Sequence, residues 1–276
     1  MIQSRRLNLM KPHSSISRIL SLLVVFSLWS GTALAQDESQ KRTRALRILA
    51  VGEAPPWEEK IQNGRRVEQD PPAGSIPPRQ VQLTNREGVE EGSPAPLRLN
   101  QISGVIAVRP GPVPLHETGQ GGLDPQVWHT LKFPTSAAAA LGIIWRDPTT
   151  KKWSKARSLT LADDVKGFPA GRVRIINVSK YPIGLAFGKE RGTLKSGQVI
   201  SRGGNAGVFA KVPLELSIKN QGGRWIRVFA QEINQSSRER TNIILYTADG
   251  VDPLRPVNAV ILREIGRTPT VPKKKS

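Results

Sequence analysis

The clearest alternation of apolar and polar residues lies in the second half of the chain. Leu214, Leu216 and Ile218 alternate with charged or hydroxyl residues, which separates an apolar face from a polar one. Because successive side chains point to opposite faces of a strand, this pattern predicts a half-buried β-strand. A weaker alternation follows over residues 225–230, where Trp225 and Phe229 place large rings on the second face as well.

Short apolar stretches recur along the rest of the chain, and turn signals separate them. Gly and Pro are frequent, and no long segment repeats apolar residues at helical spacing. Asp147-Pro148 has the chemistry of a type I turn and predicts a hairpin that leads into Trp153. This spacing predicts an all-β fold of one or two β-sandwich modules. The other predicted strands are 46–51, 81–84, 104–109, 141–145, 158–161, 173–178, 183–187, 243–247 and 259–263.

Three pairs of apolar tetrads suggest that the chain holds two similar sandwiches. The offset within a pair falls from 127 to 117 to about 100 residues, which predicts extra loop between the early strands of the first copy. Two unrelated β-rich halves could also share such short tetrads, so both interpretations stay open. We place the domains at 45–166 and 167–266, with a junction near Gly167-Phe168-Pro169. The tetrad pairs are 46–49 with 173–176, 96–99 with 213–216, and 142–145 with 243–246.

Other stretches do not fit regular strands. Residues 52–96 contain eight prolines, eight acidic and five basic residues, which predicts long loops or extended chain instead of central strands. Residues 36–44 and 267–276 have the composition of flexible tails, and the second of them ends in three lysines.

The N-terminus has the pattern of a cleavable secretory signal peptide at residues 1–35. Four basic residues and no acid precede or flank the apolar run 19–29, and small residues follow up to Ala35. We expect cleavage before Gln36. An apolar run of about 11 residues would make a helix of roughly 16 Å, shorter than the ~30 Å hydrocarbon core, so a membrane anchor is the weaker interpretation. Met10 is an alternative start.

Charge and cysteine content narrow the class of protein. The full chain has a net charge of +19; without residues 1–35 it keeps 37 basic against 22 acidic residues, a net charge of +15. An exported chain without cysteine has no disulfides, which favours a bacterial envelope, periplasmic or extracellular. Thiol catalysis and thiolate metal sites are excluded as well.

Residues Arg172–Ser179 and the apolar stretch that follows them carry a resemblance. The strand ends in an Asn-x-Ser turn at Asn177, and over about 170–265 the chain resembles exported bacterial immunoglobulin-like β-sandwich domains. The resemblance implies an extracytoplasmic sandwich without catalysis and transfers no functional residue. The first half has no Asn-x-Ser at the matching place.

Catalytic and metal signatures are weak. His116 and His129 with Glu117 and Asp124 nearby could hold zinc, but histidines in loops at this spacing favour a solvated or structural role, and we predict no metal or other cofactor. No nucleophile elbow or phosphate-binding glycine loop is present. A glycan-acting hydrolase needs only two carboxylates, which stays an alternative. The candidate acids are Glu53, Glu58, Glu59, Asp163 and Asp164.

The most distinctive pattern is tryptophan interleaved with basic residues, in two groups. In a strand, Trp153, Lys155 and Arg157 would share one face, which could bind a polyanion through cations and a stacking indole. The alternative is that the tryptophans pack in the core under basic side chains. If the face is a binding site, Trp153→Ala should weaken binding without unfolding the protein. The two groups are Trp145, Arg146, Lys151, Lys152, Trp153, Lys155 and Arg157, and Arg224, Trp225 and Arg227.

The sequence therefore favours an exported noncatalytic envelope protein with a structural or polyanion- or polysaccharide-binding role. The expected partner is an anionic envelope polymer or another envelope protein, with peripheral contact to a membrane surface and no transmembrane segment after processing. No specific nucleic acid is expected outside the cytoplasm. The alternatives are a glycan-acting hydrolase and an adaptor subunit that pairs through an exposed edge strand.

Overall fold

The computed structural model describes residues 43–55, 58–84, 94–118, 126–150, 152–203, 209–249, 253 and 255–271. All of them belong to the unit Thr43–Ser276. Within these ranges the elements are β-strands apart from one short 3₁₀ helix, so the predicted all-β fold is confirmed. The predicted signal peptide, its cleavage site at Ala35 and Gln36, and the predicted tail residues 36–42 and 272–276 lie outside the described residues.

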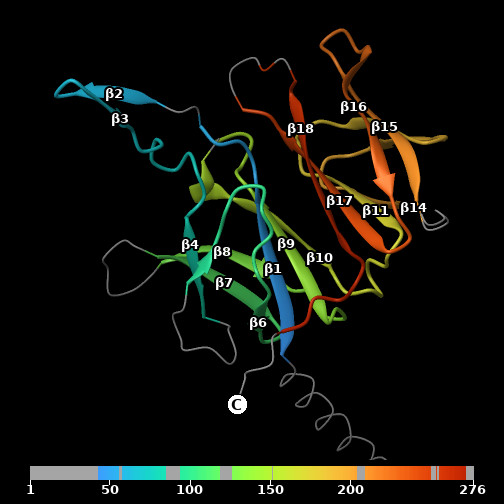
Figure 1. The fold of residues 1–276 in the computed structure, drawn as a ribbon, viewed down its shortest axis with the longest axis horizontal. Coiled ribbons are helices and arrows are strands. Elements are labelled where there is room, and N and C mark those ends of the chain that lie inside the picture. Colours follow the sequence, from blue (N-terminus) through green and yellow to red (C-terminus); the bar gives the residue numbers. More distant parts are fainter. Residues whose placement is uncertain are drawn as a thin grey trace, which may run out of the picture. The chain divides into compact units, whose positions relative to one another are not determined.

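The first half of the chain forms a β-sandwich of two four-stranded sheets, ordered β10-β9-β1-β6 and β5-β4-β7-β8 (Figure 1). Apolar side chains from both sheets, among them Leu46, Val81, Leu115 and Ile144, form one core. A separate exposed hairpin, β2 (Glu59–Gln62) with β3 (Arg65–Glu68), is inserted between β1 and β4. The sandwich strands are β1 (Arg44–Val51), β4 (Gln80–Leu83), β5 (Ala95–Pro96), β6 (Ile106–Val108), β7 (Pro112–Glu117), β8 (Val127–Lys132), β9 (Ala139–Trp145) and β10 (Arg157–Ala162).

The second half forms another sandwich, with sheets ordered β14-β11-β17-β18 and β13-β12-β15-β16. Its own core includes Ile175, Leu185, Leu216 and Ile243. The alternating Leu214, Leu216 and Ile218 of β15 all face this core, as their pattern predicts. The strands are β11 (Arg172–Asn177), β12 (Ile183–Phe187), β13 (Glu190–Leu194), β14 (Val199–Gly203), β15 (Ala210–Lys219), β16 (Trp225–Gln235), β17 (Glu239–Thr247) and β18 (Val257–Ile265).

Both sandwiches connect their strands in the same order. In each, the first strand pairs in parallel with the seventh, β1 with β9 and β11 with β17, and all other pairs are antiparallel. The register also agrees, because Ile48 lies opposite Gly142 and Ile175 lies opposite Ile243. The predicted equivalence of 46–49 with 173–176 and of 142–145 with 243–246 is therefore confirmed.

The remaining tetrad pair is wrong. Residues 96–99 begin at the end of β5, whereas 213–216 lie in β15, whose equivalent in the first sandwich is β7. The Pro-Leu pattern that the two tetrads share is a chance similarity, as is common for such short segments. The predicted extra loop between the early strands of the first copy is confirmed as the segment that carries the β2–β3 hairpin.

The predicted strands all coincide with strands of the structure, but several strands were not predicted. β7, β8, β13 and β14 carry prolines, glycines or charged residues that hide the alternation. The proline-rich stretch 52–96 was expected to lack central strands, and this is wrong for β4. Val81 and Leu83 of β4 are buried, because β4 lies between β5 and β7 in its sheet.

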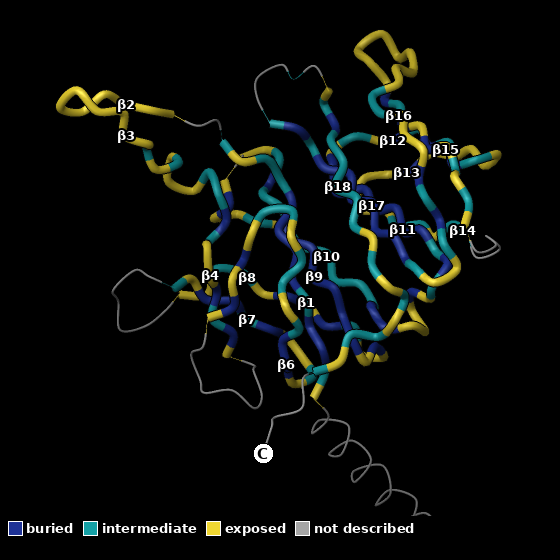
Figure 2. Tube along the Cα trace, viewed as in Figure 1, coloured by how far each residue is buried: buried dark blue, intermediate teal, exposed yellow. Residues whose placement is uncertain are grey.

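The two sandwiches pack against each other through the sheets that contain the parallel pairs. Leu49 and Ile143 of the first sandwich lie in one buried apolar cluster with Ile176 and Ile244, the equivalent residues of the second sandwich. The central strands β1, β9, β11 and β17 are consequently buried on both faces, as Figure 2 shows in dark blue. This explains why β9 is almost entirely apolar and why the other three strands contain consecutive apolar residues instead of a strict alternation.

A buried ionic cluster joins the two sandwiches at one end of this interface. Arg47 Nε donates to Asp163 Oδ2 at 2.9 Å, and Arg47 Nη1 donates to Glu264 Oε2 at 2.5 Å. Arg240, almost fully buried, lies 3.1 Å from both carboxylates. Arg174 Nη2 lies 3.7 Å from Asp163 Oδ1, and burial lowers the pKa of Arg174 to about 10 although Asp163 opposes this. Three guanidinium groups thus surround two carboxylates.

The cluster follows the internal repeat. Arg47 and Arg174 occupy equivalent positions on β1 and β11. Asp163 and Glu264 are also at equivalent positions. Leu159 of β10 is equivalent to Val260 of β18, and each acid lies four residues further along its chain segment. Each sandwich therefore contributes an arginine and an acid to the interface from the same two positions.

Candidate functional site

The first group of predicted binding residues lies on the connection between β9 and β10. β9 and β10 do form a hairpin, with Trp145 opposite Arg157, but its second strand begins at Arg157 and not at the predicted Trp153. However, Trp153 is not in a strand: Trp153–Lys155 form the 3₁₀ helix η1, and Trp153 is only 2% exposed. The predicted common face of Trp153, Lys155 and Arg157 is therefore wrong.

Trp153 is buried because its ring completes the end of the first core. A Cβ on Gly52 would lie 3.4 Å from the indole, and the Trp153 carbonyl accepts a hydrogen bond from Trp128 Nε1 at 2.9 Å. The Trp153 amide donates to the Gly74 carbonyl at 3.2 Å. For this residue the structural alternative, a core tryptophan, is the one that holds.

The two arginines of the first group have partners within the protein. Arg146 forms an ion pair with Asp249, and Arg157 Nε donates to Asp147 Oδ2 at 2.6 Å. Asp147 also accepts the amide of Thr150, which is the main reason that the pKa of Asp147 lies below its ordinary value. Exposed cations remain at Lys152 and Lys155, and Lys151 lies outside the described residues.

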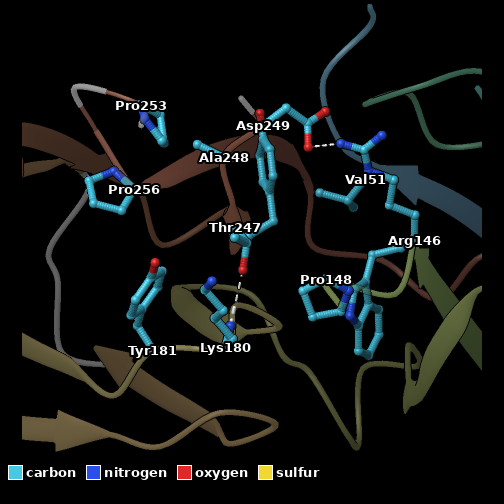
Figure 3. Close-up of a pocket in the computed structure, with 13 residues that line it drawn as sticks. Val51, Arg146, Pro148, Lys180, Tyr181, Thr247, Ala248, Asp249, Pro253 and Pro256 are labelled. Atoms are coloured by element: carbon cyan, nitrogen blue, oxygen red, sulfur yellow. Dashed lines mark hydrogen bonds and ion pairs between the residues drawn. The ribbon is translucent and has the colours of Figure 1, made fainter. Parts of the chain in front are cut away.

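Trp145 and Arg146 line a pocket of about 140 Å³ between the two sandwiches (Figure 3). Tyr246, the equivalent of Trp145, lies on the other side, and burial together with Glu53 raises its pKa to about 12. Figure 3 shows the Arg146 side chain directed at Asp249 and away from Tyr181. The pocket is small and its arginine is already neutralised, so it offers little to a polyanion.

The second group, Arg224, Trp225 and Arg227, has a different setting. Trp225 begins β16, which lies at the edge of its sheet, and 46% of the residue is exposed. Its ring lies over β12, because a Cβ on Gly184 would come within 3.0 Å of the indole. The Lys219 ammonium lies 5.4 Å from the ring centroid. The sheet thus presents a large ring to solvent where glycine leaves room for it.

A shallow hollow of about 480 Å³ surrounds this ring. Arg191 and Arg227 bring two guanidinium groups to it, and among the described residues only Arg227 has a carboxylate within 4 Å, that of Glu215 at 3.8 Å. Hydroxyls come from Thr193 and Ser217. We call this surface the Trp225 face. Its residues are Gly184, Leu185, Ala186, Arg191, Gly192, Thr193, Glu215, Leu216, Ser217, Trp225 and Arg227.

Three of the five acids considered for hydrolysis are engaged in contacts within the protein. Asp163 is enclosed by the ionic cluster, and Asp164 accepts the amides of Ala138 and Gly167. Glu53 accepts the Asp249 amide at 2.9 Å. Glu58 and Glu59 are exposed at the β2–β3 hairpin.

The two histidines are in strands and not in loops, which corrects the expectation from sequence. His116 belongs to β7 and His129 to β8, where burial lowers the pKa of His129. Asp124 lies outside the described residues. Within the described ranges, no three His, Asp or Glu side chains are grouped so that they could hold a metal ion.

Sequence reasoning found Trp225 and Arg227 but missed Gly184, Arg191 and the hydroxyls beside them. The only available signal was the small residues Gly184 and Ala186 alternating with apolar ones in β12, which marks a strand with an open outer face. The contribution of β13 could not be seen, because that strand was not predicted.

Comparison of the sequence with known proteins found no relative from which a function could be inferred. No protein-family model matches the chain, and no curated protein matches its sequence. The helical structure found in the described ranges is far too short to cross a bilayer.

Proposed function

We propose that this protein is an exported, noncatalytic component of a bacterial envelope that binds an anionic polysaccharide through the Trp225 face. The observation that carries the proposal is the half-exposed Trp225 ring beside two arginines. A tryptophan ring provides a rigid apolar platform, which suits the apolar face of a sugar ring. Glycine under the ring and a few polar groups around it give the hollow the mixed apolar and polar lining that ligand sites use.

The polar groups around the ring favour an acidic sugar. Arginine presents paired N–H donors that match a carboxylate or phosphate, and Arg191 and Arg227 lie on either side of β12 and β15. Thr193 and Ser217 add hydroxyls that can exchange hydrogen bonds with sugar hydroxyls. The net charge of +15 after removal of residues 1–35 adds a general, salt-sensitive attraction to anionic polymers.

A glycan-acting hydrolase is less well supported. Catalysis on glycosides usually needs two carboxylates that converge on one cleft. The Trp225 face contains one acid, Glu215, and it lies near Arg227. The face is therefore suited to holding a glycan and not to cleaving it.

Co-sedimentation of residues 36–276 with purified sacculi and with outer-membrane vesicles, at low and high salt, tests the proposal. We expect binding that survives high salt on one of these materials. Trp225→Ala should weaken it about tenfold, in keeping with the loss of one stacking contact. Arg191→Gln should weaken it mainly at low salt.

Two matched variants serve as controls. Phe209→Ala removes another exposed aromatic ring, and Lys155→Gln removes an exposed cation of the first group. Both should bind as the parent does. If Trp225→Ala binds like the parent, or if Lys155→Gln has the larger effect, the Trp225 face is not the binding site.

A further inference from the structure

Both sandwiches have a β-bulge at the same place in their equivalent hairpins. In the first, the pairing of β7 with β8 shifts after Leu115 and leaves Trp128 without an opposite residue. In the second, the pairing of β15 with β16 shifts after Leu216 and leaves Val228 without one. Trp128 and Val228 are therefore equivalent positions with very different side chains.

In the first sandwich the bulge residue closes a gap. The indole of Trp128 packs against the core, and its Nε1 donates to the Trp153 carbonyl in η1 at 2.9 Å. The tryptophan thus links the edge strand β8 to the connection between β9 and β10. A bulge often re-aims a side chain in this way.

In the second sandwich Val228 is too short to make this link. The described residues leave a pocket of about 840 Å³ between β16 and residues 255–256, which lie on the equivalent connection between β17 and β18. Its walls include Tyr181, Ile226 and Phe229, and Ile226 is 48% exposed. The first sandwich shows what fills such a space: an indole that is apolar on its faces and carries one donor.

The rim of this pocket is basic. Lys219, Arg227 and Arg255 contribute to the lining, and no acidic residue is among the described lining residues. An apolar occupant flanked by acidic groups would therefore be held by both burial and charge. A second copy that met this pocket with the same face would bring an equally basic rim, which disfavours a symmetric pairing of two copies here.

We propose that this pocket receives an aromatic side chain, preferably an indole, carried by an acidic segment of a partner protein. The partner's ring takes the place that Trp128 holds in the first sandwich. Apart from Arg227, the pocket and the Trp225 face have no residue in common, so this interaction does not depend on polysaccharide binding. The protein would then hold a glycan with one surface and a protein with another.

The probe is an acetylated and amidated Glu-Trp-Glu peptide, titrated into residues 36–276 and followed by backbone amide NMR shifts. We expect shifts confined to residues around Tyr181, Val228 and Arg255. Val228→Trp should fill the pocket from within, raise the melting temperature and weaken peptide binding at least about tenfold. Peptides with alanine for the tryptophan, or with lysine for both glutamates, should bind much more weakly.

Arg255→Glu is the second variant, because Arg255 is exposed and its replacement leaves the core intact. It should weaken the peptide about tenfold even if Val228→Trp fails to fold. Trp225→Ala should leave peptide binding unchanged, which separates this interaction from the polysaccharide site. No local shifts with the parent, shifts elsewhere, or equal binding by Arg255→Glu would each overturn the proposal.

Discussion

The two sandwiches share one strand order and the same register in their parallel pairs, but they differ in an inserted hairpin, at the bulge and on their outer faces. The positions retained between them pair in the parallel strands or pack across the interface, such as Leu49 with Ile176 and Arg47 with Arg174. The differences are the β2–β3 hairpin, the bulge residue and the outer face of the second sheet. Sheet pairing and the interface therefore constrain the sequence, whereas outer surfaces are free to acquire function.

The outer faces illustrate this freedom. Where the second sandwich has Gly184 and Ser217 under an indole, the first has Gln82 and His116 at the equivalent strand positions. No ring can lie flat on the first sheet in the same way, because those side chains occupy the space. The candidate binding surface consequently belongs to one sandwich only.

The largest effect should come from the charged interface that both sandwiches build. Asp163→Asn removes a fully buried carboxylate and leaves Arg47, Arg174 and Arg240 with too little negative charge. We expect it to lower the free energy of unfolding by about 3–5 kcal/mol, as when one partner of a buried pair is removed. Urea unfolding measures this. A loss below that of Glu264→Gln, the equivalent but less buried acid, would contradict the comparison.

Substituting the two tryptophans should lower the free energy of unfolding by very different amounts. Trp153→Ala removes a buried ring and should lower the free energy of unfolding by roughly 3 kcal/mol or more, contrary to the expectation from sequence that the fold would be unaffected. Trp225→Ala should cost less than about 1 kcal/mol, because the ring is half exposed. Thermal unfolding of both variants compares them directly. Similar losses would mean that Trp225 is a core residue and not a ligand contact.

The acid side of the interface should make stability depend on pH. Burial acts to raise the pKa of Glu264, but hydrogen bonds and charges of Arg47 and Arg240 outweigh it, so the pKa is lower than its ordinary value. Glu264 therefore stabilises the fold above a pH of about 4.5, and this is lost as the pH falls through the lower pKa of the folded state. Urea unfolding should show Glu264→Gln less stable than the parent at about pH 7, with the gap shrinking as the pH falls through the lowered pKa. A gap that is independent of pH would show that the carboxylate charge has no role.

The smallest effect should come from removing the inserted hairpin, which makes the first sandwich resemble the second. Every residue of β2 and β3 is exposed, and a hydrogen bond of 2.9 Å from the Gln69 amide to the Glu58 carbonyl closes the base. Replacing 58–69 by two glycines should change the free energy of unfolding by no more than about 1 kcal/mol. Calorimetry would detect a larger loss, which would mean that the hairpin contributes to folding.

The sequence predicted the strands that alternate or run continuously apolar, and it aligned two of the three repeat tetrads. It did so because consecutive apolar residues in β1, β9, β11 and β17 indicate buried strands. It missed β7 and β13, where Pro112, Pro114 and Gly192 interrupt the pattern without preventing pairing. It misplaced Trp153, because a buried and an exposed tryptophan look alike when both have basic neighbours.

By itself, the sequence determined the all-β class, most strand positions and the strongly basic charge, since these follow from local pattern and composition. The tertiary structure alone decided that the repeat has a matched register, that Arg47, Arg174, Asp163 and Glu264 meet, and that Trp225 is exposed while Trp153 is not. The physical reason is that most of these features depend on residues far apart in the sequence, such as Arg47 and Glu264, which are 217 positions apart. Which side chains come together over such distances is fixed by sheet order and by packing between sheets, and neither is encoded in neighbouring residues.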